Sequence, residues 1–227
     1  MNIKLAVFDM AGTTVRDFDN VHEALMEALG FYDINVSRDE VNKVMGMPKP
    51  LAIRVLLTKE LPASQITDEL LSQVYSRFEA IMVDFYKTDP LVTEKEGAEK
   101  LFRYLKSKGI SVGIDTGFNR IIADTIMERL GWKDKQLIDF SVTSDEVPDG
   151  RPHPDMIFKA MDFFHISDPQ EVIKIGDTAS DMEEGRNAGC RYIIGITTGA
   201  FTVEELRHTP HTHLVSHLSE IPAIIGL

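Results

Sequence analysis

Short apolar segments alternate with amphipathic segments through most of this 227-residue chain, and this alternation narrows the possible folds more than any other feature. Buried parallel strands read as short continuous apolar runs, whereas surface helices repeat apolar residues every three or four positions. We predict strands at 4–8, 110–115, 138–143, 172–176, 192–196 and 213–215. We predict helices at 96–108, 119–130, 154–164 and 181–188. The alternation indicates an α/β fold, a doubly wound parallel sheet with a Rossmann-like core.

The interval between the first two strands departs from this rhythm. It contains no convincing strand, but amphipathic patterns predict helices at 21–29, 38–45, 51–57 and 68–86. A segment of this length is too long for a loop. We therefore predict an inserted helical cap domain at 17–89 and a catalytic core formed by 1–16 and 90–227. Because the cap follows the first strand directly, it should lie over the carboxyl end of the sheet.

Composition excludes several classes of function. The formal net charge of −12 argues against nucleic-acid binding, which relies on Lys and Arg to neutralise phosphates. No apolar stretch approaches the roughly 20 residues of a membrane span. The first strand begins almost at residue 1, which leaves no room for a signal peptide, and the single Cys190 cannot form an internal disulfide. We expect a cytoplasmic protein that binds neither nucleic acid nor membrane.

Carboxylates follow two of the predicted strands. Asp9 ends the first apolar run and leads into Ala11-Gly12-Thr13, and Asp177 ends the run 172–176. Ligands of open α/β sheets bind at the carboxyl ends of the strands. Asp181, four residues after Asp177, can reach the same ion directly or through water. Carboxylate oxygens and retained waters suit Mg²⁺, so this edge of the sheet is a predicted magnesium site.

Two further strand ends carry groups suited to phosphate. Thr116 and Gly117 offer a hydroxyl and backbone N–H groups after the strand at 110–115. Arg151 follows the strand at 138–143 and offers a guanidinium, which binds phosphate oxygens in a fork. We predict that Thr116, Gly117 and Arg151 bind a phosphoryl group.

Taken in order, these motifs resemble the haloacid dehalogenase superfamily. The resemblance covers about the whole core and rests on Asp9-x-Ala11-Gly12-Thr13, Thr116-Gly117, Arg151-Pro152 and Gly176-Asp177-Thr178-x-Ser180-Asp181. It implies that Asp9 is a nucleophile that forms an aspartyl-phosphate. It also implies that the Ala11 carbonyl, Asp9 and Asp177 bind Mg²⁺ with support from Asp181.

Two departures point to the phosphonatase-like branch of that superfamily. Most phosphatases of the superfamily carry a second Asp where this chain has Ala11, and a Lys where it has Arg151. Phosphonatases break a carbon–phosphorus bond after a cap lysine converts an aldehyde to an imine. The segment Met45-Gly46-Met47-Pro48-Lys49 resembles their cap motif, which implies that Lys49 is catalytic and that Met45 and Arg54 contact substrate.

Other positions depart from the phosphonatase pattern and keep alternatives open. Ala52 stands where that pattern has a histidine, and Phe118 stands where it has a tyrosine. The alternatives are a phosphatase for a small phosphomonoester or acyl phosphate, and a non-catalytic phosphate-binding protein on the same scaffold. A phosphatase without an Asp at position 11 would lack general acid assistance, typically ~10²–10⁴-fold. A helical cap can also pair two protomers, which leaves a homodimer open.

Overall fold

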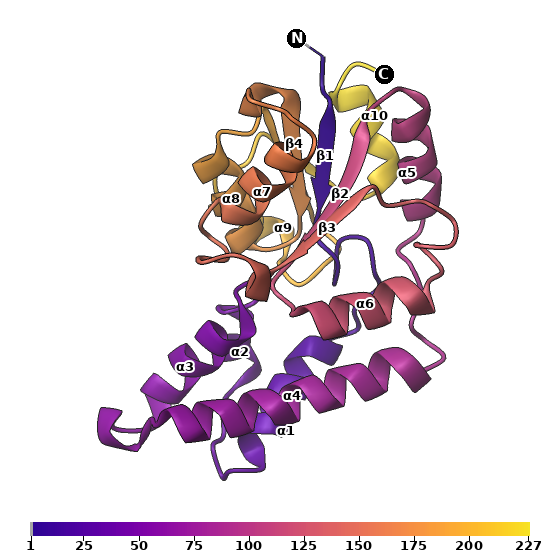
Figure 1. Cartoon of the computed structure of the whole chain (residues 1–227). Helices are drawn as coiled ribbons and strands as arrows, with labels where there is room; N and C mark the ends of the chain where they lie inside the picture. The colour runs from indigo at the N-terminus through magenta and orange to yellow at the C-terminus, as the bar shows by residue number, and fades with distance from the viewer. Residues whose placement is uncertain (1) are drawn as a thin grey trace.

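The computed structural model describes residues 2–227, in which a parallel sheet is flanked by helices and extended by a helical layer at one end (Figure 1). The sheet has the strand order β3-β2-β1-β4-β5-β6, and every neighbouring pair is parallel. The strands are β1 (Leu5–Phe8), β2 (Ser111–Thr116), β3 (Phe140–Thr143), β4 (Val172–Gly176), β5 (Tyr192–Ile196) and β6 (His213–Val215). The predicted doubly wound fold is therefore confirmed.

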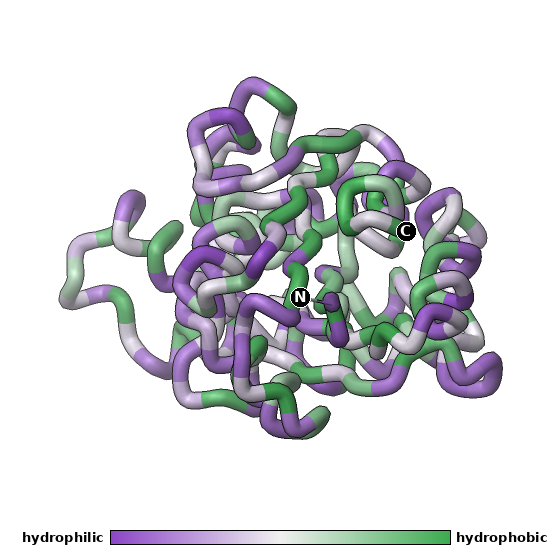
Figure 2. Tube along the Cα trace, turned by 90° about the horizontal axis from the view of Figure 1, so that it is seen from above, coloured by the Kyte–Doolittle hydropathy of each residue, from purple (hydrophilic) through white to green (hydrophobic). Residues whose placement is uncertain are grey.

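Period-two alternation in β1 divides the core between the two faces of the sheet. Leu5 and Val7 pack in a cluster with residues of the helices on one face, while Ala6 and Phe8 join a larger cluster on the other. Viewed from above, β1 begins near the middle of the molecule and hydrophilic residues are frequent on the peripheral loops (Figure 2). The helices after the cap are α5 (Ala98–Ser107), α6 (Arg120–Arg129), α7 (Asp155–Phe163), α8 (Ala179–Ala188), α9 (Val203–Leu206) and α10 (Ile221–Ile224).

Four helices between β1 and α5 lie together beyond the carboxyl ends of the strands (Figure 1). They are α1 (Asn20–Gly30), α2 (Arg38–Asn42), α3 (Lys49–Glu60) and α4 (Asp68–Thr88). Helix α2 is shorter than the predicted 38–45: it ends at Asn42, and residues 43–46 form turns, with φ at +79° at Gly46. Helix α3 is longer than predicted, since Pro48 precedes its first turn and Pro50 is accommodated within that turn.

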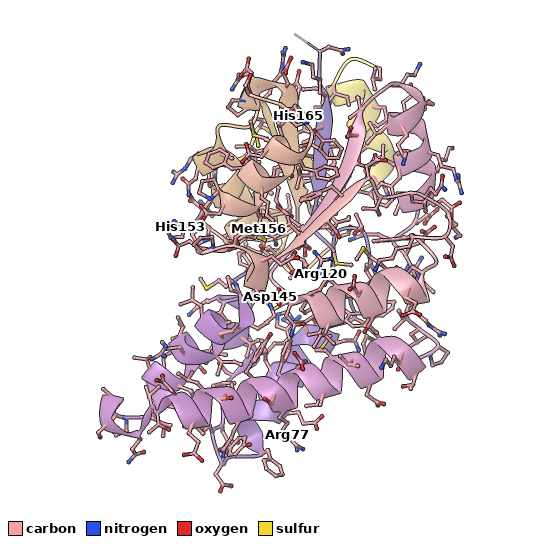
Figure 3. The ribbon with its side chains drawn as sticks, in the orientation of Figure 1. Arg77, Arg120, Asp145, His153, Met156 and His165 are labelled. Atoms are coloured by element: carbon pink, nitrogen blue, oxygen red, sulfur yellow. The ribbon has the colours of Figure 1, made fainter. Side chains whose placement is uncertain are left out.

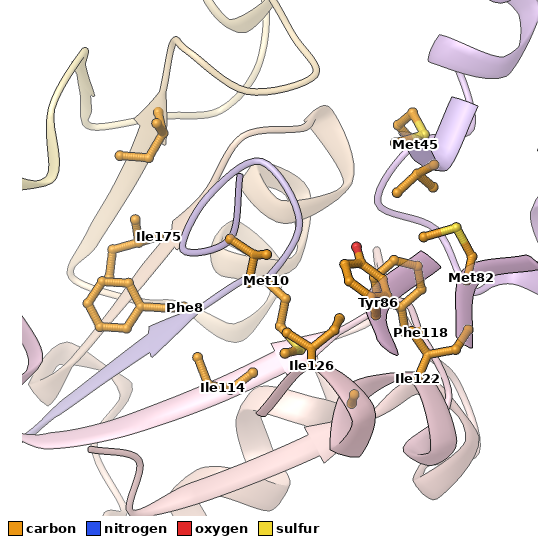
Figure 4. Packing of buried hydrophobic residues seen from close by; sticks show 14 of the residues in the cluster. Phe8, Met10, Met45, Met82, Tyr86, Ile114, Phe118, Ile122, Ile126 and Ile175 are labelled. Atoms are coloured by element: carbon orange, nitrogen blue, oxygen red, sulfur yellow. The ribbon is translucent and has the colours of Figure 1, made fainter. Parts of the chain in front are cut away.

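Helix α4 joins this layer to the core through aromatic packing. The Phe118 ring, just after β2, stacks on Phe78 and meets Tyr86 edge-on, and both partners are on α4. Figure 4 shows Tyr86 and Phe118 together, with Met82 and Ile122 beside them. At the same junction, the Arg120 N–H donates to Asp145 at 3.1 Å, and Figure 3 places both residues between the sheet and the cap helices.

The two segments that connect the core with the cap helices pair with each other. An antiparallel bridge joins Val15 to Glu94, and the Arg16 N–H donates to the Thr93 carbonyl at 3.0 Å. The division into 1–16, 17–89 and 90–227 stays a prediction, and this pairing lies close to both of its boundaries. Among residues 2–227, no helix combines the length and apolar character needed to cross a membrane.

Candidate active site

Strand register brings the predicted carboxylates together. Phe8 aligns with Ile114 of β2 on one side and with Ile175 of β4 on the other. Asp9 directly follows Phe8 and Asp177 follows Ile175 by two residues, so both carboxylates emerge at one edge of the sheet. This is the edge where ligands of doubly wound folds bind.

The Asp9 carboxylate is buried beside a guanidinium. Only 6% of Asp9 is exposed, and its Oδ1 accepts a hydrogen bond from Arg151 Nη1 at 2.7 Å. The Thr14 hydroxyl donates to the Asp9 carbonyl at 2.7 Å and fixes the turn that follows. Burial raises the pKa of Asp9 to about 6, and the nearby Arg151 charge limits the rise.

Asp177 lies between two loops that each supply a hydrogen-bond donor. The Thr13 hydroxyl, after β1, donates to Asp177 Oδ1 at 2.7 Å. The Ala200 N–H, after β5, donates to Asp177 Oδ2 at 2.6 Å. A Cβ at Gly12 or Gly199 would collide with this carboxylate, so both loops approach it through glycine. Burial, together with the neighbouring Asp9 and Asp181, raises the pKa of Asp177 to about 8.

Asp9, Asp177 and Asp181 form an acidic cluster that suits a divalent cation. One oxygen from each of the three buried carboxylates lies within 4.8 Å of the others. Asp181 Oδ1 is 2.8 Å from Arg151 Nη1 but, among residues 2–227, has no hydrogen-bond partner. Ala11 lines the cavity beside Asp9. Hard oxygen donors and a surplus of buried negative charge are the properties that such a cation requires.

Arg151 is more deeply embedded than a surface phosphate ligand. Its guanidinium is fully buried and contacts Asp9, Asp115, Asp181 and Glu184. One edge of the guanidinium therefore faces Asp9. We predicted that Arg151 binds a phosphoryl group, and a phosphoryl group attached to Asp9 would lie beside this edge.

Lys174 and Glu184 are components of the site that we did not identify from the sequence. The Lys174 amine contacts Asp115, lies 2.9 Å from Glu184 Oε2 and lies 3.2 Å from Asp181 Oδ1. A lysine within the apolar run of β4 was an available signal, because a buried charge in a strand requires partners. Glu184 lies one helical turn after Asp181, on the same face of α8.

The cap side of the site carries a buried amine. Only 4% of Lys49 is exposed, its Nζ donates to the Met47 carbonyl at 3.2 Å, and it lies 5.3 Å from the Phe118 ring centre. Burial lowers the pKa of Lys49 to about 8, although the Asp9 charge opposes the shift. Lys49 therefore deprotonates more readily than an ordinary lysine.

One small cavity joins the two halves of the site. The space open to the centre of a water molecule is about 20 Å³. The cavity is lined by Asp9, Ala11, Val21, Met45, Gly46, Lys49, Thr116, Gly117, Phe118 and Thr178. Most predicted site residues thus meet here, and Arg151, Asp177 and Asp181 adjoin it through Asp9.

Three glycines let the cap loop at 45–48 approach the core loops closely. A Cβ on Gly117 would lie 2.7 Å from the Met47 carbonyl oxygen, and one on Gly150 would lie 2.5 Å from Pro48 Cγ. A Cβ on Gly46 would collide with the Thr178 hydroxyl. The cap loop therefore packs against three core loops, those after β2, β3 and β4.

One predicted site residue, Arg54, lies outside the cavity, as do His22, His153, His165 and Cys190. Arg54 is half-exposed on α3, and its Nη2 contacts Asp68 at 3.3 Å, so the structure does not bring it to Lys49. His22 is buried beside Asn42, at 3.1 Å. Figure 3 shows His153 and His165 at opposite ends of α7. Cys190 is buried, and burial raises its pKa to about 12.

Comparisons with known proteins show which proteins this chain resembles. The model of the haloacid dehalogenase-like hydrolase family matches residues 6–194. A phosphonoacetaldehyde hydrolase of Bacillus mycoides (strain KBAB4) is 33% identical over 213 residues, covering 88% of this chain and 78% of the relative. One from Bacillus cereus is 31% identical over 231 residues, covering 94% of this chain and 84% of the relative.

Solved structures share the fold at lower identity. A phosphonoacetaldehyde hydrolase-like protein from Oleispira antarctica has a TM-score of 0.82 at 21% identity, covering 99% of this chain and 92% of the other. A predicted phosphoglycolate phosphatase from Haemophilus somnus 129pt has a TM-score of 0.81 at 17% identity, covering 98% and 97%. At these identities the likeness concerns the fold alone.

Proposed function

The chain belongs to the haloacid dehalogenase-like hydrolase family, and from that premise we propose that it hydrolyses the carbon–phosphorus bond of a small aldehyde phosphonate such as phosphonoacetaldehyde. One observation carries this choice of substrate. The buried amine of Lys49 and the buried carboxylate of Asp9 line the same small cavity. An amine with a lowered pKa can attack a carbonyl carbon, while the carboxylate can attack phosphorus.

The proposed reaction uses both groups in sequence. The unprotonated Lys49 amine adds to the aldehyde carbon and, with loss of water, forms a protonated imine. Asp9 then attacks phosphorus; the carbon–phosphorus electron pair moves into the imine, and the carbon leaves as an enamine on Lys49. Protonation of the enamine followed by hydrolysis of the imine releases acetaldehyde. Water hydrolyses the aspartyl-phosphate and restores Asp9.

The remaining site residues would bind the phosphoryl group and the cation that offsets its negative charge. We assign Thr116, Gly117 and the Arg151 guanidinium to phosphoryl oxygens. Asp9, Asp177, Asp181 and the Ala11 carbonyl would hold a divalent cation, proposed to be Mg²⁺, which would offset repulsion between carboxylate and phosphoryl group. The cap at 17–89 would admit and select the substrate.

The methyl group at position 11 supports carbon as the leaving atom. Ala11 lines the cavity but cannot donate a proton to a leaving alkoxide. An enamine leaving group needs no general acid there, because the imine nitrogen takes up the electron pair.

A phosphatase is the second candidate, and the cavity wall near Lys49 favours it. Ala52 stands where a histidine would serve imine formation, and Phe118 presents a ring without a hydroxyl. Among the described residues that line the cavity, none is a histidine. Acyl phosphates or activated esters would suit such a site, because their leaving groups need little protonation.

A turnover assay separates the two candidates. Purified protein with Mg²⁺ would be given phosphonoacetaldehyde beside a panel of small phosphomonoesters and acyl phosphates. The proposal expects phosphate release from the phosphonate, loss of that release in Asp9→Asn, and loss in Lys49→Ala. Release from esters or acyl phosphates alone would replace the proposal with the phosphatase.

Borohydride trapping tests the imine directly. With phosphonoacetaldehyde present, reduction should attach a stable adduct to Lys49, and peptide mass spectrometry should locate it there. Lys43→Ala is the matched control, since Lys43 is an exposed cap lysine six positions away and should leave the adduct unchanged. Absence of any adduct on Lys49 during turnover would remove the imine mechanism.

A further inference from the structure

Lys95 lies on the segment that returns from the cap helices to the core. Its backbone N–H donates to the Thr14 carbonyl at 2.8 Å, next to the bridge between Val15 and Glu94. This pairing fixes the start of the Lys95 side chain relative to the loop that follows Asp9. The side chain is half-buried and points back toward the core loops.

The Lys95 amine joins two loops that are far apart in the sequence. It donates to the Gly12 carbonyl in the loop after β1. It also donates to the Thr198 carbonyl in the loop after β5, at 2.9 Å. One side chain thus holds both loops at a set separation.

The same two loops hold the Asp177 carboxylate. Thr13, adjacent to Gly12, donates its hydroxyl to Oδ1, and Ala200, two residues after Thr198, donates its N–H to Oδ2. Gly12 and Gly199 press against the carboxylate from the two sides. A change in the separation of these loops would therefore rotate or displace Asp177.

We propose that Lys95 is a positioning residue for the metal site: by joining the Gly12 and Thr198 carbonyls, it holds the loops that orient Asp177. The contact at Gly12 also restrains the peptide that follows the Ala11 carbonyl. Partners of this kind, which orient ligands without touching the ion, typically change metal affinity by ~10–100-fold. The inference rests on the proposed metal site but is independent of the substrate.

A purely electrostatic role for Lys95 predicts the opposite sign. An ammonium group close to the acidic cluster repels a divalent cation, so removing the charge alone would tighten metal binding. Loss of the two hydrogen bonds would instead loosen the loops and weaken metal binding. The direction of the change therefore separates positioning from charge.

Isothermal titration of metal-free protein with Mg²⁺ measures this direction without substrate. We expect Lys95→Met to raise the Kd about 10-fold or more. Lys95→Arg keeps the charge and several N–H donors and should stay within about threefold of wild type. Lys4→Met is the control: Lys4 pairs with Glu171 at the opposite end of β1, and its loss should leave the Kd unchanged.

Circular dichroism confirms that each variant is folded before titration. If Lys95→Met does not fold, Lys95→Gln takes its place. Its shorter side chain keeps one N–H donor group, and we again expect the Kd for Mg²⁺ to rise. Unchanged or tighter Mg²⁺ binding in the folded neutral variant would overturn the positioning role and leave the proposed function intact. No Mg²⁺ binding by wild type would overturn the metal site itself, and this inference with it.

Discussion

A lysine with its amine out of water is a different reagent from a lysine on the surface. Lys49 is held between the Met47 carbonyl and the face of Phe118, and burial lowers its pKa to about 8. At pH 7 roughly 10% of such amines are neutral, against roughly 0.03% for an ordinary lysine. The cap can therefore supply a nucleophilic amine without a histidine beside it.

This pKa predicts the pH dependence of the proposed reaction. Attack on the aldehyde requires the neutral amine, so kcat/KM for phosphonoacetaldehyde should rise with pH and level off above about 8. The Asp9 carboxylate, whose pKa is about 6, adds a second rising step at lower pH. A pH–rate profile checks this, with an activated phosphomonoester as the comparison substrate. A profile that is flat from pH 6.5 to 9 for the aldehyde would contradict a titrating Lys49.

Sequence identifies the groups at strand ends better than the partners that surround them. Asp9, Asp177 and Lys49, which the motifs indicate, lie within or beside the cavity. The contacts of Lys174, Glu184 and Lys95 were missed, because they join residues distant along the chain and carry no local pattern. Arg54 matched a motif, but the helix turns it toward Asp68. A motif specifies a residue's identity, and packing decides where the side chain points.

At the scale of elements, the cap loop fits closely against the core loops because the glycines at this contact have no Cβ. Strand limits follow from apolar runs, and β4, β5 and β6 have the predicted bounds. The close packing of the loop at 45–48 depends on glycine geometry and on distant neighbours. It could not be read from periodicity, although the glycines themselves are visible in the sequence.

Adding a single methyl group should test whether activity requires this close packing of the cap loop against the core loops. In Gly117→Ala, the new Cβ would lie 2.7 Å from the Met47 carbonyl oxygen, so the cap loop must move outward. We expect kcat/KM to fall about 10²-fold, because displacements of about 1 Å have costs of this size. Gly30→Ala is the matched control, since its Cβ would meet nothing within 4 Å. Equal kinetics for the two variants would show that close seating is not required.

At the scale of the whole molecule, this acidic protein gathers buried carboxyl groups at one point. The buried carboxyl groups of the site outnumber its three buried basic side chains, Lys49, Arg151 and Lys174. These carboxyl groups belong to Asp9, Asp115, Asp177, Asp181 and Glu184. Sequence predicts a parallel sheet with an acidic edge and a helical layer above it. It does not predict that this edge is fully buried, which follows from the packing of the cap against the loops.

This cluster of buried carboxyl groups predicts that a divalent cation stabilises the fold. At 100 times its Kd, Mg²⁺ should add about 2.7 kcal/mol to the free energy of unfolding and raise Tm by about 5–10 °C. Chelation should reverse the change in a thermal unfolding scan. Asp177→Asn should abolish the shift, whereas Asp162→Asn, at an exposed position on α7, should retain it. A Tm indifferent to Mg²⁺ in wild type would argue against the site.

The small cavity between Asp9 and Lys49 has a consequence for hydration. Its space of about 20 Å³ for water centres suits about one water molecule, too little for a phosphonate, so the cap must move away to load each substrate. In the proposed chemistry, imine formation releases one water and hydrolysis of the aspartyl-phosphate consumes one. Up to phosphoryl release the two steps therefore need no net water from bulk solvent, and one further water is needed to free the aldehyde.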